Sequence, residues 1–368
     1  MSSGFGLLLR YRRPWFLIGF CLLAVPMAVQ MTSSPEAASD VEARMLSPTP
    51  TLPQSFARWR TLPRELDRYL ADHFGLRTEL IRAHGALRYA VTLPTDLRVI
   101  IGRDSWLFLN GDGTIEQATG RLLREPAISK FADRAAALQT RLQAKKARFL
   151  VAIPPNGSTI NRFRLPAWAA DKPAVSEYDL MMSALAARAV AAVDLRPPLL
   201  AANSVNPAYR RTDTHWNRLG ALVAYNAVVD ALREPGWAID PDRVLAGFET
   251  VPGGDLARLL AVSADASDED ARIDLSFYNP SAFTVQNIDT QFESGGDLIE
   301  TGRKGPTVLV IGDSFTRGFW QDYFSLHAGK YIWIHHELCS FATSVVESHA
   351  PDVVILAPAE RQMFCFGK

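Results

Sequence analysis

Residues 307–318 of this 368-residue chain read TVLVIGDSFTRG, and the predicted fold is organised around this segment. Its first part is an apolar, mostly β-branched run, as expected for a parallel strand that is buried on both faces. Gly312 permits a sharp turn, and Ser314 follows two residues later. We therefore expect a strand, a tight turn and a helix, with the serine hydroxyl near the free backbone N–H groups of the helix start. The alternative is that Asp313 or Ser314 only caps the helix.

A second candidate group lies earlier in the chain, where residues 213–216 read DTHW. Asp213 and His215 are two residues apart, and side chains with this spacing point to the same side of an extended segment. The carboxylate could then orient the imidazole while the other ring nitrogen takes a proton from a serine. For this motif alone, an ordinary surface loop is the alternative. Together with Ser314 it predicts a Ser-His-Asp triad, although the G-x-S-x-G pattern is absent.

The sequence GDSF after an apolar strand, preceded by DTHWN and a helical segment, resembles the SGNH-like O-acetyltransferases of bacterial exopolysaccharides. Within that group it resembles the alginate O-acetyltransferase family, from about Leu52 to the C-terminus. Ordinary SGNH hydrolases carry the serine early, whereas Ser314 follows Asp213 and His215, a permuted order similar to that of the alginate acetyltransferases. Four further motifs resemble this family: ADHFGLR at 71–77, GRDSWLF at 102–108, GDL at 254–256 and ER at 360–361.

This resemblance implies O-acetylation of an exopolysaccharide in the periplasm through an acetyl-serine intermediate. Ser314 would be the nucleophile, His215 the base and Asp213 the residue that holds the imidazole. It also implies that a membrane protein of the MBOAT type delivers the acetyl groups, and no cofactor is expected. Two other functions remain open: a polysaccharide acetyl esterase with the same triad, and a non-catalytic polysaccharide-binding or assembly protein.

Strands and helices alternate along the chain, which predicts an α/β fold with right-handed crossovers. We expect a parallel sheet of about five strands flanked by helices, of the flavodoxin type found in SGNH hydrolases. A short hairpin is expected at 97–109, an irregular region at 234–275 and an extra hairpin at 276–292. Two helices within 56–91 carry an apolar stripe that should be buried. The expected strands are 149–153, 191–194, 307–311, 331–335 and 353–357, and the expected helices are 126–146, 177–190, 217–232, 315–327 and 341–349.

Two more residues follow predicted strands and so fall at the sheet edge where such folds bind ligands. Asn156 is a candidate oxyanion-hole donor, or only a turn residue after two prolines. Arg361 could bind a sugar or a carboxylate, or pair with a structural acid.

Composition restricts the possible ligands. The chain is 48% hydrophobic and 21% charged, which is enough to bury a large core. Its 39 basic and 39 acidic residues cancel, so no basic field argues for a nucleic-acid partner, and a polysaccharide acceptor would be held by local features. The acidic run at 265–274 is expected to be a solvated loop, because its spacing is not that of an EF-hand, and no metal site is predicted.

The N-terminus has the pattern of a signal anchor. An apolar run at 14–31 follows Arg10, Arg12 and Arg13, and it is about as long as the ~17–25 residues that cross a bilayer. We expect a helix in the inner membrane with the rest of the chain in the periplasm, although a cleaved signal remains possible. The predicted division is an anchor at 1–31, a linker at 32–53 and an SGNH-like acetyltransferase domain at 54–368.

Cysteines 339 and 365 lie in the exported part of the chain, where disulfides can form. Each follows a predicted parallel strand, so both should emerge at one edge of the sheet. A bridge between Cys339 and Cys365 and two separate thiols are both compatible with this pattern.

Overall fold

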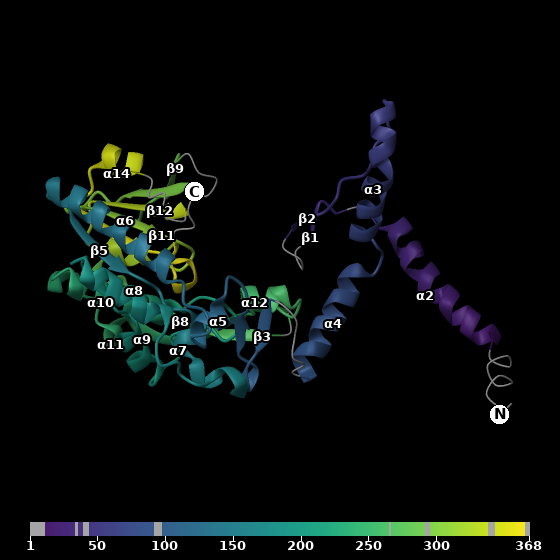
Figure 1. Cartoon of the computed structure of the whole chain (residues 1–368), viewed down its shortest axis with the longest axis horizontal. Helices are drawn as coiled ribbons and strands as arrows, with labels where there is room; N and C mark the ends of the chain where they lie inside the picture. The colour runs from purple at the N-terminus through teal and green to yellow at the C-terminus, as the bar shows by residue number, and fades with distance from the viewer. Residues whose placement is uncertain are drawn as a thin grey trace. The chain divides into compact units, whose positions relative to one another are not determined.

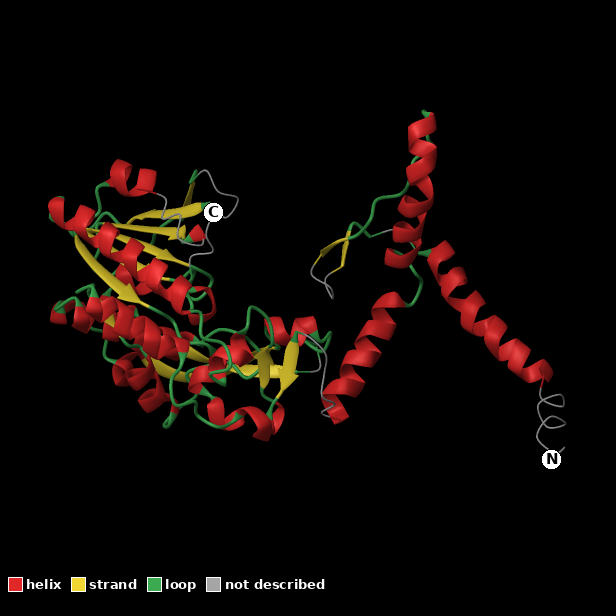
Figure 2. Ribbon diagram, viewed as in Figure 1, coloured by secondary structure: helices red, strands yellow, loops and turns green. Residues whose placement is uncertain are grey.

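The computed structural model of the chain describes residues 12–33, 36–39, 44–91, 98–264, 266–290, 295–337 and 343–364. The chain divides into two compact units, which are described separately here and drawn in Figures 1 and 2. One unit comprises Met1–Thr92 and Arg258–Asp265, and the other comprises Leu93–Ala257 and Ala266–Lys368. Cys339 and Cys365 lie outside the described residues, so neither a bridge between them nor two separate thiols is tested.

The described residues of the first unit form mainly three helices. The segment Pro14–Thr32 has a mean hydropathy of 1.8 and is long and apolar enough to cross a membrane. The two helices expected within 56–91 are present, but their apolar stripe is not buried as predicted, since Phe56 and Trp59 are exposed. The elements of this unit are α2 (Arg12–Thr32), α3 (Phe56–Asp72), α4 (Arg77–Val91) and the antiparallel pair β1 (Ala38–Ser39) and β2 (Arg44–Met45).

The second unit is a mixed α/β domain around a central sheet (Figure 2). Its helices are α5 (Thr114–Ala118), α6 (Glu125–Ala144), α7 (Gly157–Ile160), α8 (Glu177–Ala187), α9 (Arg196–Asn203), α10 (Arg218–Ala231), α11 (Pro241–Val244), α12 (Asp255–Leu259), α13 (Trp320–Phe324) and α14 (Thr343–His349). Its strands are β3 (Val99–Ile101), β4 (Leu107–Leu109), β5 (Arg148–Ala152), β6 (Ala192–Val193), β7 (Leu245–Pro252), β8 (Ser267–Ile273), β9 (Gln286–Ile288), β10 (Gly296–Glu300), β11 (Thr307–Gly312), β12 (Lys330–His335) and β13 (Val353–Ala357).

The central sheet has seven strands in the order β6-β5-β13-β11-β12-β10-β9. The first five are parallel and are the five strands expected from the sequence. β10 and β9 extend the sheet as antiparallel strands, and neither was predicted from the sequence as part of it. β10 was not predicted because the buried Asp297 interrupts the apolar pattern that is expected of an interior strand. The Asp297 carboxylate accepts hydrogen bonds from Arg317 at 2.8 and 2.9 Å.

The strand order supports the permuted connectivity. If the five parallel strands are counted from β11, through β12 and β13, and on to β5 and β6, their spatial order is 2-1-3-4-5. This is the order of a flavodoxin-like sheet, with the chain opened at a different point. Such sheets bind ligands in the crevice where the order reverses. In this domain that crevice lies between the carboxyl ends of β11 and β13.

Both faces of β11 are buried, as its sequence requires. Val308 and Val310 pack on one face with α9, α10 and α13, and Leu309 and Ile311 pack on the other with α6, α8 and α14. The domain therefore has three layers: helices, the sheet and helices. Because both faces of β11 are covered, only the end of the strand can face solvent.

The region at 234–275 is not irregular, which corrects the prediction. β7 pairs with β8 in an antiparallel hairpin, and β8 contains most of the acidic run expected to be a solvated loop. Asp268 and Asp270 are only 3% and 2% exposed. Charge alone suggested solvation, but these carboxylates are bonded to polar groups of the 210–218 segment.

Two other expectations were wrong in part. The helix expected at 315–327 is a series of turns followed by the short α13, so Ser314 stands on a turn rather than directly before an α-helix. The described residues 276–290 form no hairpin of their own, because β9 pairs with β10. The hairpin expected at 97–109 is confirmed by the β3–β4 pair.

Candidate active site

Ser314 is exposed at the end of β11, on a turn held from both sides. A Cβ at Gly312 would overlap the Thr316 side chain and lie 3.3 Å from the Ala357 carbonyl oxygen, so only glycine fits there. The buried Asp313 accepts hydrogen bonds from the N–H groups of Phe315 at 2.9 Å and Ala359 at 2.7 Å. The carboxylate therefore ties the serine turn to the segment after β13.

The DTHW loop is fastened to this turn by aromatic packing. Trp216 is fully buried and forms an isolated antiparallel bridge with Tyr209. Its ring centroid lies 5.2 Å from that of Phe315, edge to face, and 5.9 Å from that of Trp320. Because Phe315 follows Ser314 directly, the tryptophan places the loop against the serine.

The structure brings Ser314, His215 and Asp213 together. His215 Nε2 lies 2.8 Å from Ser314 Oγ, and His215 Nδ1 lies 2.6 Å from Asp213 Oδ1. Asp213 Oδ1 also accepts the His215 backbone N–H at 3.0 Å, a contact that the two-residue spacing makes possible. The carboxylate on Nδ1 favours the tautomer with its proton on that nitrogen and leaves Nε2 free to accept the serine proton.

Asp213 is held in its ionised form. Burial alone would raise its pKa, but the hydrogen bond and charge of His215, its backbone N–H and the charge of Arg210 outweigh burial and lower the pKa to about 2. A carboxylate that stays ionised can stabilise the imidazolium that forms when His215 takes a proton.

This pKa predicts a pH dependence of stability. Because the folded pKa of Asp213 is depressed from 3.8 to about 2, its contribution is present above about pH 4 and is lost as pH falls through 2. The shift corresponds to about 2 kcal/mol in the free energy of unfolding. The difference in unfolding free energy between wild type and Asp213→Asn, measured in urea, should therefore shrink between pH 4 and 2. A difference constant with pH would contradict it.

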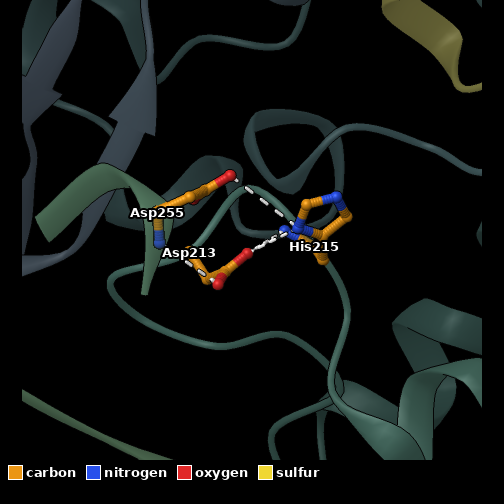
Figure 3. Close-up of side chains that lie close together, drawn as sticks. All are labelled: Asp213, His215 and Asp255. Atoms are coloured by element: carbon orange, nitrogen blue, oxygen red, sulfur yellow. Dashed lines mark hydrogen bonds and ion pairs between the residues drawn. The ribbon is translucent and has the colours of Figure 1, made fainter. Parts of the chain in front are cut away.

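A second carboxylate, missed as a site residue, stands beside the first (Figure 3). Asp255 Oδ2 lies 3.8 Å from His215 Nδ1. Its two oxygens accept from the Thr214 N–H at 2.8 Å and the Thr214 hydroxyl at 2.5 Å, and its own N–H donates to Asp213 at 3.3 Å. Asp255 thus braces the residue between Asp213 and His215. Its position in the GDL motif was the only signal in the sequence.

Asp213, His215 and Asp255 are also close enough to hold a metal ion, since one ligand atom from each lies within 4.8 Å of the others. His215 Nδ1 and the carboxylate oxygens already form hydrogen bonds with one another or with Thr214. A metal would have to displace these bonds and the Nδ1 proton, so the arrangement fits a hydrogen-bonded triad better.

Gly254 is required by the close approach of its backbone to Asp213. A Cβ at this position would overlap the Asp213 carboxylate, and the Gly254 N–H donates to the Thr212 hydroxyl at 2.9 Å.

We expect Gly254→Ala to push Asp213 away from His215 and to lower turnover about 10²-fold, the typical cost of a displacement near 1 Å at a reacting group. Gly236→Ala is the matched control, because a Cβ there meets nothing within 4 Å. Steady-state kinetics with an activated acetyl ester would measure both variants. Equal rates would contradict the assigned role of Gly254.

Asp268 anchors the start of the DTHW loop. It accepts the N–H groups of Arg211 at 2.7 Å and Thr212 at 3.1 Å, and it also accepts the Thr212 hydroxyl. That hydroxyl in turn accepts the Gly254 N–H. The acidic hairpin therefore supports both the DTHW loop and the GDL motif.

Asp268→Ala should lower the free energy of unfolding by roughly 2–3 kcal/mol, because it leaves buried N–H and hydroxyl groups without an acceptor. Asp274→Ala on the exposed end of the same hairpin should have little effect. Urea unfolding would measure the two variants, and similar midpoints would argue against the anchor.

Asn156 and Arg361 lie near the triad but are not bonded to it. Both line a cavity of about 20 Å³ beside Asp213, large enough for roughly one water molecule. Asn156 is buried, its N–H donates to Glu360 at 2.7 Å, and its side-chain oxygen has no partner among the described residues. Arg361 lies 5.1 Å over the Phe315 ring, and no ion pair joins it to a described carboxylate. Their roles stay predictions.

Comparison with known proteins relates this chain to a family. Residues 99–326 match a family described as "SGNH hydrolase-like domain, acetyltransferase AlgX". A "Probable alginate O-acetylase AlgJ" of Pseudomonas putida is 27% identical over 219 residues, which cover 58% of this chain and 53% of that protein. This chain therefore matches about half the length of that relative.

Solved structures agree on the fold. Bacillus cereus PatB1 with a sulfonyl adduct is 13% identical, with a TM-score of 0.53 over 72% of this chain and 95% of that one. A DHHW family protein from Eubacterium siraeum is 15% identical, with a TM-score of 0.51 over 74% and 96% of the two chains. At such identities the likeness concerns the fold alone.

Proposed function

Because this chain belongs to the SGNH hydrolase-like AlgX acetyltransferase family, we propose that it O-acetylates a bacterial exopolysaccharide. The observation that carries the proposal is the contact of 2.8 Å between Ser314 Oγ and His215 Nε2, with Asp213 at 2.6 Å from the other ring nitrogen. A buried carboxylate, an imidazole and an exposed hydroxyl in this order are the parts of a nucleophilic triad.

In the first half-reaction, Ser314 Oγ attacks the carbonyl carbon of an acetyl donor while His215 Nε2 takes the hydroxyl proton. Asp213 accepts the Nδ1 hydrogen bond and stabilises the imidazolium. The tetrahedral intermediate then collapses, the bond to the donor oxygen breaks, and His215 returns the proton to the leaving group. The product of this half-reaction is an acetyl ester on Ser314.

In the second half-reaction, a sugar hydroxyl takes the place of the leaving group. His215 removes its proton, the sugar oxygen attacks the acetyl carbon, and Ser314 leaves with the proton from His215. Water could attack in the same way, so transfer rather than hydrolysis depends on seating the sugar and excluding water. Asn156 and Arg361 line the small cavity beside Asp213. We propose that they contribute contacts to the oxyanion or to the substrate.

The esterase alternative uses the same three residues, and the non-catalytic alternative uses none of them. Incubation of the full chain in detergent with p-nitrophenyl acetate, with and without an oligosaccharide acceptor, separates the three. Acetylated sugar, identified by mass spectrometry, is the expected result. Free acetate alone would favour the esterase, and no turnover would favour the binding protein.

The apolar α2 supports a proposal on location. We propose that α2 anchors the chain in the inner membrane with the catalytic domain in the periplasm, and that an MBOAT-type protein supplies acetyl groups across the membrane. A cleaved signal remains the alternative. A reporter fused after Lys368 should be active only in the periplasm, and cytoplasmic activity would refute the orientation.

A further inference from the structure

The helix α3 carries an apolar stripe that the described residues of its unit leave exposed. Phe56, Trp59, Pro63, Leu66 and Leu70 are spaced alternately three and four residues apart, so they share one face of the helix. All five are exposed, Phe56 by 84% and Trp59 by 55%. The proposed acetyl transfer makes no use of this stripe. An exposed apolar face of this kind marks an interaction surface.

The charged residues beside the stripe are basic where the stripe is most exposed. Between residues 56 and 64 the charged side chains are Arg58, Arg60 and Arg64, and the acids of α3 come later in the helix. With about 3.6 residues per turn, Arg58 and Arg60 lie on the two flanks of the stripe. From there their apolar stems can cover the stripe edge while the guanidinium groups reach phosphates. Arginine on the polar side and Trp, Phe and Leu on the other are typical of a helix that lies in a membrane interface.

Pro63 favours a hydrated partner for the stripe over a dry one. It stands inside α3 and has no N–H to donate to the Trp59 carbonyl oxygen, one turn earlier. Because Trp59 and Pro63 share the stripe, this carbonyl lies on the same side of the helix. A dry contact with another helix would leave the carbonyl without a donor, whereas the headgroup layer of a bilayer supplies water.

The contacts that hold the end of α3 within its unit use the opposite side of the helix. Asp72 lies there, and its carboxylate accepts hydrogen bonds from Arg44 at 2.6 Å and from the Ser47 hydroxyl at 2.7 Å. The predicted linker is therefore fastened to the polar side of α3, and the stripe stays accessible.

The same end of α3 lies beside the proposed anchor helix. Gly75 stands in the turn between α3 and α4, where a Cβ would overlap the Pro26 carbonyl oxygen of α2 and lie 2.8 Å from the Gln30 nitrogen. Only glycine permits this approach. Because α2 ends at Thr32, the turn lies near the level at which α2 would leave a bilayer. The helix α3 thus starts from the membrane surface if α2 crosses it.

We propose that α3 lies in the surface of a phospholipid bilayer, with its stripe inserted below the headgroups and with Arg58 and Arg60 at lipid phosphates. The inference goes beyond acetyl transfer and rests on the location proposed for α2. A chain held by α2 alone could leave the surface by the reach of its linker, about 3.5 Å for each extended residue. Binding through α3 would keep the chain at the membrane as far as Gly75.

Photolabelling of the full chain in vesicles tests the proposal. The vesicles contain phosphatidylethanolamine, phosphatidylglycerol and a phospholipid with a diazirine in its acyl chain. After irradiation, lipid adducts are located by mass spectrometry of peptides. Adducts are expected on α2 and on the stripe of α3.

Leu66→Glu should lower the yield of α3 adducts about tenfold relative to α2 adducts, because it places a charge in the middle of the inserted face. Ala71→Glu is the matched control. It adds the same charge at an exposed position on the side of Arg64, and it should label like wild type.

The outcomes separate this inference from the rest of the proposed function. Adducts on α3 that Leu66→Glu loses and Ala71→Glu keeps support it. Labelling of α2 without α3 overturns it and indicates that a second copy or another protein covers the stripe, and equal yields in Leu66→Glu and wild type also overturn it. If α2 is not labelled, the proposed location fails and the inference fails with it. Hydrolysis of p-nitrophenyl acetate should be unchanged in both variants, and its absence in wild type would refute the triad chemistry alone.

Discussion

Ser314→Ala should abolish acetyl transfer, with a loss of turnover on the order of 10⁶-fold. The variant removes the hydroxyl oxygen that lies 2.8 Å from His215 Nε2 and that is proposed to form the acetyl ester. The fold should be unaffected, because the hydroxyl is exposed and its removal leaves no cavity. Mass spectrometry of the intact protein after brief exposure to p-nitrophenyl acetate measures the intermediate directly, as an added acetyl group in wild type.

The matched control is Ser204→Ala, which removes an exposed hydroxyl at the end of α9. It should acetylate and turn over like wild type. His215→Ala should be as inactive as Ser314→Ala, and the double variant should lose little more than either single one, because the residues act as a unit. If the Ser314→Ala protein were still acetylated and transferred acetyl groups normally, the nucleophile would be another residue and the mechanism would be wrong.

Asp213→Asn should lower turnover about 10⁴-fold while leaving some activity. An amide that turns its NH₂ group toward Nδ1 favours the tautomer with the proton on Nε2, which can no longer accept the serine proton. It also removes the negative charge that stabilises the imidazolium. Initial rates of ester hydrolysis and of transfer should fall together, since both half-reactions use His215.

Asp255→Asn is the graded comparison. The Asp255 carboxylate is 3.8 Å from His215 Nδ1 and mainly holds Thr214. Turnover should therefore fall much less in Asp255→Asn than in Asp213→Asn. If Asp255→Asn were the more damaging change, Asp255 rather than Asp213 would be the acid that orients the imidazole. Unfolding midpoints of both variants show whether either loss comes from misfolding.

Local patterns in the sequence were enough for the five parallel strands and for the pairing of Asp213 with His215. All four residues from Val308 to Ile311 are apolar, so both faces of β11 must be buried. Few structures other than a parallel strand covered on both faces satisfy this requirement. The two-residue spacing of Asp213 and His215 likewise restricts where the carboxylate can reach. The sequence correctly predicted a turn at Ser314, but not its form, because turn signals do not specify how soon a helix begins.

The sequence did not reveal what holds these residues in place. Asp268 looked like a solvated acid because its charge is visible in the sequence while its partners, Arg211 and Thr212, are far away along the chain. β10 was missed for the same reason, since Asp297 is acceptable inside a sheet only when Arg317 is known to meet it. A charged residue in the sequence indicates that its burial would be unfavourable. The sequence does not indicate which distant residue will compensate that charge.

From the sequence alone, the five parallel strands, the turn at Ser314 and the pairing of Asp213 with His215 could therefore be predicted. These depend on backbone geometry and on side-chain spacing over a few residues. Only the tertiary structure decided that Trp216 packs on Phe315, that Gly254 lies against Asp213, and that Gly75 lies against α2. Such contacts join segments whose separation in the chain carries no information about their distance in space, and they form only when the layers of the fold have packed.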